Sequence, residues 1–161
     1  MDWTIVRSSW FSQNFSESFL REAVMSGIVA LPIGDVHEPF IDVEDIADVA
    51  VAALTHDRHA GALYEVTGPA LITFAEAAEE IARATGRSVR FEQISLDAYR
   101  DAMRSDGVPG DAVALVTYLF TTVLDGRNSR LTDGVQRALD RESTAFASYA
   151  RRAAAAGAWS D

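Results

Sequence analysis

One segment near the start of the sequence combines aromatic and amide side chains in a way that suits a ligand. Trp10 and Phe11 are followed by Gln13 and Asn14, and the segment comes directly after residues 3–8, a β-rich run typical of a strand in a parallel sheet. Ligands of open α/β sheets bind beyond the carboxyl ends of such strands. An apolar wall with a few amides suits a nicotinamide or quinone ring. The other interpretation is that Trp10 and Phe11 are core residues and that Asn14 caps a helix.

The side chains that the sequence lacks exclude several kinds of chemistry. It has no cysteine, which removes thiolate nucleophiles, disulfides and cysteine-ligated metal sites. Its 14 basic residues are all arginine, so neither a Schiff base nor a Tyr-x-x-x-Lys pair can form. We therefore assign no catalytic residue. The run His56-Asp57-Arg58-His59 lacks a third ligand at suitable spacing, so we expect a solvated loop and no metal site.

Charge and hydropathy exclude two classes of partner. The formal net charge is −10, which disfavours nucleic acid and anionic membranes alike. No stretch approaches the ~18 apolar residues of a membrane span, and the first residues do not form a signal peptide. We expect a cytoplasmic protein without a nucleic-acid or membrane partner, and the absence of cysteine fits a reducing compartment.

Strands alternate with helices up to Ile94, after which only helices are expected. The patterns predict strands at residues 3–8, 28–31, 40–43, 63–68 and 88–94, and later helices at residues 113–124, 132–139 and 143–156. Earlier helices should follow capping residues, namely Asn14 with Glu17, Asp42 with Asp45, Thr73 with Glu76, and Ser95. This alternation indicates the α/β class, with residues 1–95 as the α/β part and residues 96–161 as the helical part of a single domain.

A nucleotide-binding turn is missing from this α/β pattern. Neither G-x-G-x-x-G nor G-x-x-G-x-x-G nor a P-loop occurs. The glycines of such turns let the backbone reach a pyrophosphate at a helix N-terminus. Gly61, Gly68, Gly107 and Gly110 stand singly and are interpreted as turn residues.

Three blocks resemble the NmrA-like proteins, which are atypical members of the short-chain dehydrogenase/reductase family. The first block is Thr4-Ile5-Val6-Arg7 with Trp10-Phe11 and Gln13-Asn14-Phe15; the second is PFIDVEDIADVA from Pro39; the third is YEVTGPALIT from Tyr64. They are similar to the family's strand before an aromatic segment, its Phe-Ile-x-Val-x-Asp-Ile-Ala signature and its Leu-Thr-Gly-Pro-x-x-Leu-Thr run. The resemblance covers residues 3–95. Ser8 replaces the family's proline, which loosens that turn.

The resemblance implies the C-terminal part of a Rossmann-like doubly wound fold, with few short strands and an all-helical tail. The N-terminal nucleotide-binding half, with its glycine-rich turn, would then lie before Met1. The implied cofactor is NADP or NAD in the full-length parent, and none is expected for this chain alone. Ser9 and Trp10 would contact the cofactor, while Phe11, Gln13 and Asn14 would contact the substrate.

The resemblance also places a polar and aromatic loop near the mouth of the substrate pocket. This loop contains His37, Glu38, Phe40 and Asp42, of which His37 and Phe40 are the expected substrate contacts. A simpler interpretation is that Asp42 and Asp45 cap a helix and that His37 is a solvated turn residue.

Three functions are compatible with these features. The first is the substrate-binding half of an NAD(P)H-dependent oxidoreductase, inactive alone, which takes a small molecule of quinone-like character. The second is a fragment of a non-enzymatic NAD(P) sensor that binds a protein partner. The third is a stand-alone chain that forms a homodimer through the exposed sheet edge at residues 3–8.

Overall fold

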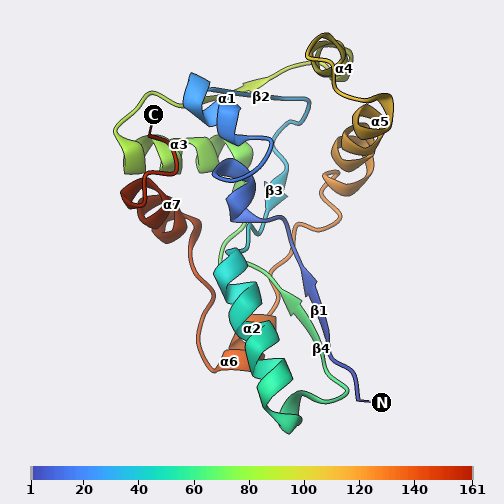
Figure 1. Ribbon diagram of the computed structural model, residues 1–161, viewed down its shortest axis with the longest axis vertical. Coiled ribbons are helices and arrows are strands. Elements are labelled where there is room, and N and C mark those ends of the chain that lie inside the picture. Colours follow the sequence, from blue (N-terminus) through green and yellow to red (C-terminus); the bar gives the residue numbers. More distant parts are fainter. Residues whose placement is uncertain (1, 161) are drawn as a thin grey trace.

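The computed structural model describes residues 2–160, which form two lobes along one long axis (Figure 1). One lobe contains α1, α3 and α7 with β2, and α4 and α5 project beside it; the other contains β1, β4, α2 and α6. In chain order the elements are β1 (Ile5–Ser8), the 3-10 helix η1 (Ser12–Phe15), α1 (Arg21–Ser26), β2 (Ile28–Leu31), β3 (His37–Glu38), α2 (Val43–Thr55), the 3-10 helix η2 (Asp57–His59), β4 (Leu63–Val66), β5 (Ile72–Thr73), α3 (Phe74–Thr85), β6 (Arg90–Gln93), α4 (Leu96–Ser105), α5 (Gly110–Tyr118), the π-helix η3 (Leu119–Val123), α6 (Gly134–Leu139) and α7 (Phe146–Ala155).

The strands pair two by two. β1 pairs with β4 and β2 pairs with β6, both in parallel, whereas the short strands β3 and β5 are antiparallel. Parallel pairs joined through helices confirm the predicted α/β class, and the described residues after β6 are helical or irregular. None of the helices in residues 2–160 has the length and apolar character needed to cross a membrane.

Most of the predicted helix starts are confirmed by their caps. The Asp42 side chain accepts from the Glu44 N–H at the start of α2, and the Ser95 side chain caps α4. Thr73 and Glu76 form a reciprocal capping box at the start of α3. These caps satisfy N–H groups that have no partner within the helix, which is why the sequence locates these starts well.

The helix predicted from Asn14 is wrong in its first half. Residues 12–15 form the 3-10 helix η1, and α1 begins only at Arg21, after Leu20, which provides no side-chain cap. The reason is tertiary: the Ser12 N–H donates to the Ile41 carbonyl, and Gln13 Oε1 accepts from the Val43 N–H. These bonds hold the segment against the loop before α2, and they override the local helical pattern.

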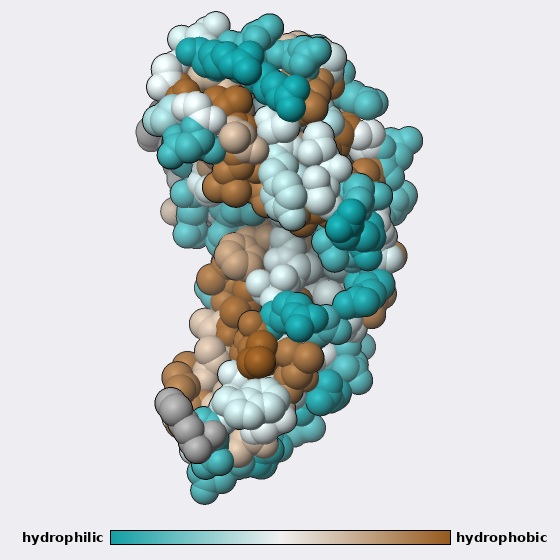
Figure 2. Space-filling view, turned by 90° about the vertical axis from the view of Figure 1, so that its right-hand side faces the viewer, coloured by the Kyte–Doolittle hydropathy of each residue, from teal (hydrophilic) through white to brown (hydrophobic). Residues whose placement is uncertain are grey.

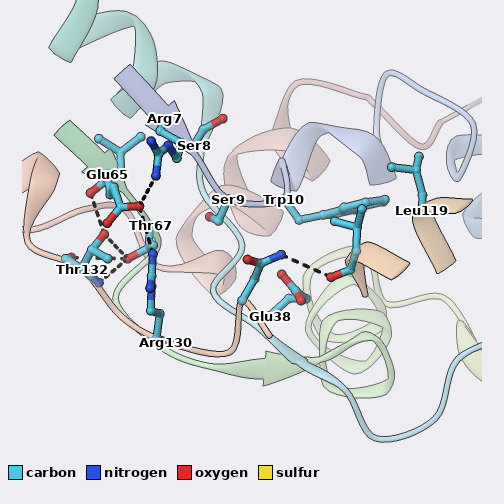
Figure 3. A pocket seen from close by; sticks show the side chains of 13 residues that line it. Arg7, Ser8, Ser9, Trp10, Glu38, Glu65, Thr67, Leu119, Arg130 and Thr132 are labelled. Carbon is cyan, nitrogen blue, oxygen red and sulfur yellow. Dashed lines mark hydrogen bonds and ion pairs between the residues drawn. The ribbon is translucent and has the colours of Figure 1, made fainter. Parts of the chain in front are cut away.

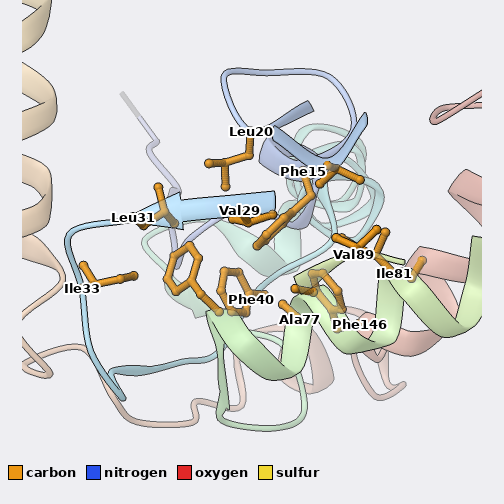
Figure 4. Close-up of a cluster of buried hydrophobic side chains, with 14 of the residues drawn as sticks. Phe15, Leu20, Val29, Leu31, Ile33, Phe40, Ala77, Ile81, Val89 and Phe146 are labelled. Atoms are coloured by element: carbon orange, nitrogen blue, oxygen red, sulfur yellow. The ribbon is translucent and has the colours of Figure 1, made fainter. Parts of the chain in front are cut away.

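Two separate clusters of buried side chains form the interior. The larger cluster lies between α1, α3, α7 and the β2–β6 pair, and it includes Phe15, Phe40, Phe74 and Phe146 in edge-on or tilted contacts (Figure 4). The smaller cluster lies between α2, α6 and the β1–β4 pair. The helical tail therefore contributes to both clusters, because α7 packs on α3 while α6 packs on α2 and β4.

Buried carboxylates of α2 and its cap connect the clusters to the tail. Asp42 is fully buried and accepts from Gln13 Nε2 at 2.7 Å and from Arg152 of α7. Asp45 is likewise buried, and it accepts from Arg141 at 2.6 Å and from the Thr144 backbone at 2.6 Å. Removing one member of such a buried pair leaves an uncompensated charge, so these contacts fix the tail to α2.

Gly68 is required by a close approach of two backbones. A Cβ atom at this position would lie 2.0 Å from the Phe40 carbonyl oxygen, and the Gly68 N–H donates to the Pro39 carbonyl at 3.1 Å. The glycine of the Val-Thr-Gly-Pro run thus lets β4 end directly against the loop that leads into α2.

We predict that Gly68→Ala lowers the stability of the chain, because the added methyl group collides with backbone atoms that cannot rotate away. The expected loss in the free energy of unfolding is about 1–3 kcal/mol or more. Gly110→Ala is the matched control, since a Cβ atom there meets no atom within 4 Å. Urea denaturation of both variants measures the difference, and equal midpoints for the two would contradict the prediction.

The outer side of β1 forms an exposed sheet edge in the described residues, because β1 pairs only with β4 there. Ile5 and Ser9 donate toward β4; successive N–H groups alternate in direction, so those of Val6 and Ser8 face away from it. Trp3 and Ile5 remain 54% and 49% exposed. Figure 2, which faces the side on which β1 lies, shows hydrophobic surface on the lower lobe.

We predict that two copies of the chain associate through this β1 edge at high concentration. Ile5→Lys should weaken the association, because it places a charge beside the edge, whereas Leu115→Lys on α5 should not, although Leu115 is 59% exposed. Added salt should strengthen the association, because it screens the net charge of −10 on each copy. Sedimentation velocity measures this. A monomer at every concentration, or equal effects of the two variants, would count against the edge.

Candidate functional site

A cavity of about 330 Å³ opens at the carboxyl ends of β1 and β4. Its lining comes from the end of β1 and the residues after it, from β3, from the end of β4, from η3 and from the segment before α6; these residues are Arg7, Ser8, Ser9, Trp10, Glu38, Glu65, Val66, Thr67, Leu119, Val123, Asn128, Arg130 and Thr132. This is the edge at which open α/β sheets bind ligands, and the volume falls at the lower end of ligand pockets.

One end of the cavity carries charge. Arg7 and Arg130 both donate to Oε1 of Glu65, at 3.0 and 2.9 Å (Figure 3). Thr132 holds the crossing segment against β4, because its hydroxyl donates to the Glu65 carbonyl at 2.6 Å and its N–H donates to Thr67 Oγ1 at 3.1 Å. Two guanidinium groups share one carboxylate here, so this end keeps one positive charge in excess.

The other end of the cavity is apolar and contains one buried acid. Trp10, Leu119 and Val123 supply the apolar surface, and Figure 3 shows Trp10, Leu119 and Glu38 at the end away from Arg7. Leu119 and Val123 belong to the π-helix, in which the Leu124 N–H donates to the Leu119 carbonyl at 2.9 Å. Such widened turns are frequent at functional sites, because they redirect side chains within a helix.

Glu38 is unusual for a charged residue type. It is 2% exposed, and its Oε1 has no hydrogen-bond partner among residues 2–160. Burial, reinforced by the negative charge of Asp125, raises the pKa of the Glu38 carboxyl from 4.5 to about 7. The indole N–H of Trp10 is a second buried polar group without a partner in the described part of the chain.

Several curated relatives of this chain are oxidoreductases. The chain is 34% identical over 155 residues to the uncharacterized oxidoreductase YesF of Bacillus subtilis, with 96% of this chain and 54% of YesF covered. It is 33% identical over 156 residues to an NAD(P)H azoreductase of Xenophilus azovorans, with 97% of this chain and 54% of the azoreductase covered. The chain is thus related to NAD(P)-dependent reductases, which agrees with the resemblance of its sequence to the NmrA-like proteins. It spans about half the length of the curated relatives it matches.

Solved structures show the same fold. An NADPH-dependent quinone oxidoreductase of Escherichia coli superposes with a TM-score of 0.80 at 20% identity, covering 94% of this chain and 55% of that one. The Rossmann-like part and the helical tail expected from the sequence are therefore confirmed as fold. No family model matches the chain.

The predicted cofactor contacts both line the cavity. The Ser9 hydroxyl donates to the Pro39 carbonyl at 2.6 Å and its N–H donates to Val66 at 3.1 Å, so its position is fixed by β4 and by the loop before α2. Trp10 packs edge-on against Phe19 and Phe74. Its ring thus packs in the core on one side and lines the cavity on the other. The interpretation of Trp10 as a core residue is therefore compatible with a position beside a ligand.

The predicted substrate contacts lie outside the lining of this cavity. Phe11 is 40% exposed and bridges to Ile41, Gln13 binds Asp42 and the Val43 N–H, and Asn14 lies within η1. His37 is exposed, with its ring near the Asp35 carbonyl, and Phe40 is buried in the larger cluster. Their roles in substrate binding stay predictions; the contacts that are present position the loop before α2.

The histidine loop is more ordered than its composition indicates. His59 is 1% exposed, and its ring lies 2.8 Å from the Tyr64 hydroxyl, so the expectation of a fully solvated loop is wrong at this residue. The cause is packing against β4, which the local sequence does not reveal. Among residues 2–160, no group of three or more acidic or histidine side chains is placed to hold a metal ion.

No pattern in the local sequence marks Glu38, Arg130 or the η3 turn as part of a binding site. Glu38 was named only as a member of the loop before α2. Glu38 lies in a strand of only two residues, two positions before an apolar run. A strand this short shows no periodicity that would distinguish a buried acid from an acid on the surface. Its burial depends on β5 and on the residues of η3, which lie far along the chain.

Glu38 should make the stability of the chain depend on pH. Because the folded state holds its proton to a higher pH than the unfolded state, the free energy of unfolding should fall as pH rises from about 4.5 to about 7. A pKa difference of one corresponds to about 1.4 kcal/mol, so the full loss is on the order of 3 kcal/mol. Glu38→Gln should therefore be more stable than the wild type at pH 8 and similar at pH 4.5. Glu142→Gln, on the surface, is the control in urea denaturation; a Glu38→Gln effect that does not change with pH would contradict this.

Proposed function

We propose that this chain is the substrate-binding half of an NAD(P)H-dependent oxidoreductase that reduces small, flat acceptors. The observation that carries the proposal is the cavity at the carboxyl ends of β1 and β4, with one aromatic and one charged end. Support also comes from the relatives, since an azoreductase and a quinone oxidoreductase both reduce conjugated small molecules. The setting that we propose is the cytoplasm, which suits a chain without cysteine.

The residues present fit the ring end of a dinucleotide and not its phosphates. Ser9 and Trp10 follow β1 at the cavity, and an indole beside a small hydroxyl residue suits a nicotinamide or an acceptor ring. The turn after β4 does not form a phosphate cradle, because the Gly68 N–H is already bonded to Pro39. When bound, the reduced nicotinamide would supply the hydride, and this chain would hold and orient the acceptor.

The charged end has a separate task in this proposal. Arg7 and Arg130 share Glu65, and the remaining positive charge attracts anionic groups into a protein whose net charge is −10. Their bonds to one carboxylate also fix the segment that carries Asn128 and Thr132 over the cavity. The end with Trp10 is left for an uncharged ring.

We predict that the chain alone neither binds NADPH measurably nor oxidises it, because the pyrophosphate-binding turn is not among its residues. Titration of NADPH followed by its fluorescence tests the binding, and a micromolar dissociation constant would contradict the division of roles proposed here.

A longer protein, in which this chain is joined to a glycine-rich nucleotide-binding half, should oxidise NADPH with a quinone as acceptor. Absorbance at the NADPH band measures the turnover. Tight NADPH binding without turnover of quinones or azo dyes would favour a sensor over an enzyme.

A further inference from the structure

The Glu38 carboxyl group is placed for a ligand that the rest of the chain does not provide. Its Oε1 is buried without a partner among residues 2–160, yet the side chain lines the cavity. A buried polar group without a hydrogen-bond partner destabilises the folded state. The Trp10 N–H is unpaired as well, and its ring lines the same end. Glu38 and Trp10 both line this cavity and each carries an unsatisfied polar atom, which favours a ligand here because native structures rarely leave buried polar atoms unpaired.

Glu38 can act as a donor near neutral pH. Burial and the charge of Asp125 raise its pKa to about 7, so that half of the molecules carry the proton at that pH. Two sets of charged or titratable groups surround Glu38. The nearer set consists of His37 on its own strand, Glu76 at the start of α3, and Asp125 with its ion-pair partner Arg127. The other set lies at the far end of the cavity and consists of Arg7, Glu65 and Arg130. Of these groups, Asp125 is the one whose negative charge adds to burial in raising the pKa of Glu38.

The surroundings of Glu38 limit the charge and the shape of its ligand. An anion would meet both Asp125 and the ionised form of Glu38, so an uncharged ligand is favoured there. The apolar surface of Trp10, Leu119 and Val123 suits a flat ring. A protonated carboxyl donates one hydrogen bond and an indole donates another, so the matching ligand atom is an acceptor such as a carbonyl oxygen.

We propose that protonated Glu38 is the substrate-binding hydrogen-bond donor of this cavity and that it binds the carbonyl oxygen of an uncharged, quinone-class ring lying against Trp10. This assignment rests on the proposed function and gives its site a specific contact. Glu38 is a binding residue in this proposal. Ionisation of Glu38 removes the donor and places a negative charge beside the carbonyl oxygen, so binding is coupled to proton uptake.

Isothermal titration calorimetry of the wild-type chain with menadione, an uncharged naphthoquinone, tests the proposal. The dissociation constant should rise about tenfold between pH 6 and pH 8, following the protonated fraction of a group with a pKa of about 7. At pH 8 the binding enthalpy should vary with the ionisation enthalpy of the buffer, because the complex takes up a proton. This readout uses the unmodified chain and does not depend on any variant folding.

Two variants separate Glu38 from the rest of the cavity. Glu38→Gln keeps a donor without a charge, so it should retain the affinity seen at pH 6 and lose the pH dependence. Glu38→Leu keeps the volume but removes the donor, and it should bind menadione at least tenfold more weakly at pH 6. Glu142→Gln should behave as the wild type. Thermal unfolding of each variant confirms that it is folded.

The outcomes that overturn the proposal differ from those that overturn the proposed function. Menadione binding without proton uptake and without response to Glu38→Gln would show that Glu38 is satisfied by water and that the ring binds elsewhere. Absence of menadione binding at pH 6 would also overturn it. The proposed function fails separately, if the longer protein binds NADPH but does not oxidise it with any quinone or azo acceptor.

Discussion

The buried carboxylate of Asp42 is the contact on which the arrangement of this chain depends. It caps α2, accepts from Gln13 of η1 and pairs with Arg152 of α7, so three distant segments meet at one side chain. These bonds compensate its loss of hydration, which alone would make a buried charge strongly unfavourable. One turn later, the buried carboxylate of Asp45 likewise accepts hydrogen bonds, from the Arg141 side chain and the Thr144 N–H. The contacts that Asp42 and Asp45 make between distant segments are therefore polar, although each lobe has an apolar interior of its own.

The cavity follows from the loop that Asp42 fixes. The loop before α2 lies between the end of β1 and the end of β4, because the Pro39 carbonyl accepts from both Ser9 and Gly68. Glu38, just before it, is thereby turned toward Trp10 and the η3 turn instead of toward solvent. The Ser129 hydroxyl donates to the His37 carbonyl at 2.5 Å, so the segment on the far side of the cavity is attached to the same loop.

The sequence predicted the features that depend on neighbouring residues. The caps at Asp42, Thr73 and Ser95 are predictable because a cap needs only a few adjacent positions. The end of a parallel strand is likewise a local signal, and it pointed to Ser9 and Trp10, which line the cavity, as well as to Phe11, Gln13 and Asn14, which do not. The helix from Asn14 failed because contacts with Ile41 and Val43 decide that segment. The burial of Glu38 could not be predicted for the same reason, since its environment is made by Asp125, Leu119 and Val123, more than 80 residues away.

The π-helix at Leu119–Val123 affects how the shape of this cavity can change during evolution. A π turn holds one residue more than an α turn, so loss of a single codon would convert it to a regular α-helix. The wider π turn takes up the extra residue, so the flanking parts of the segment would keep their direction, and only the side chains within the turn would change their spacing. Leu119 and Val123, which line the cavity together with Trp10, are the side chains whose spacing would change. A change in the shape of the cavity is thus one short deletion away, with the rest of the helix left in place.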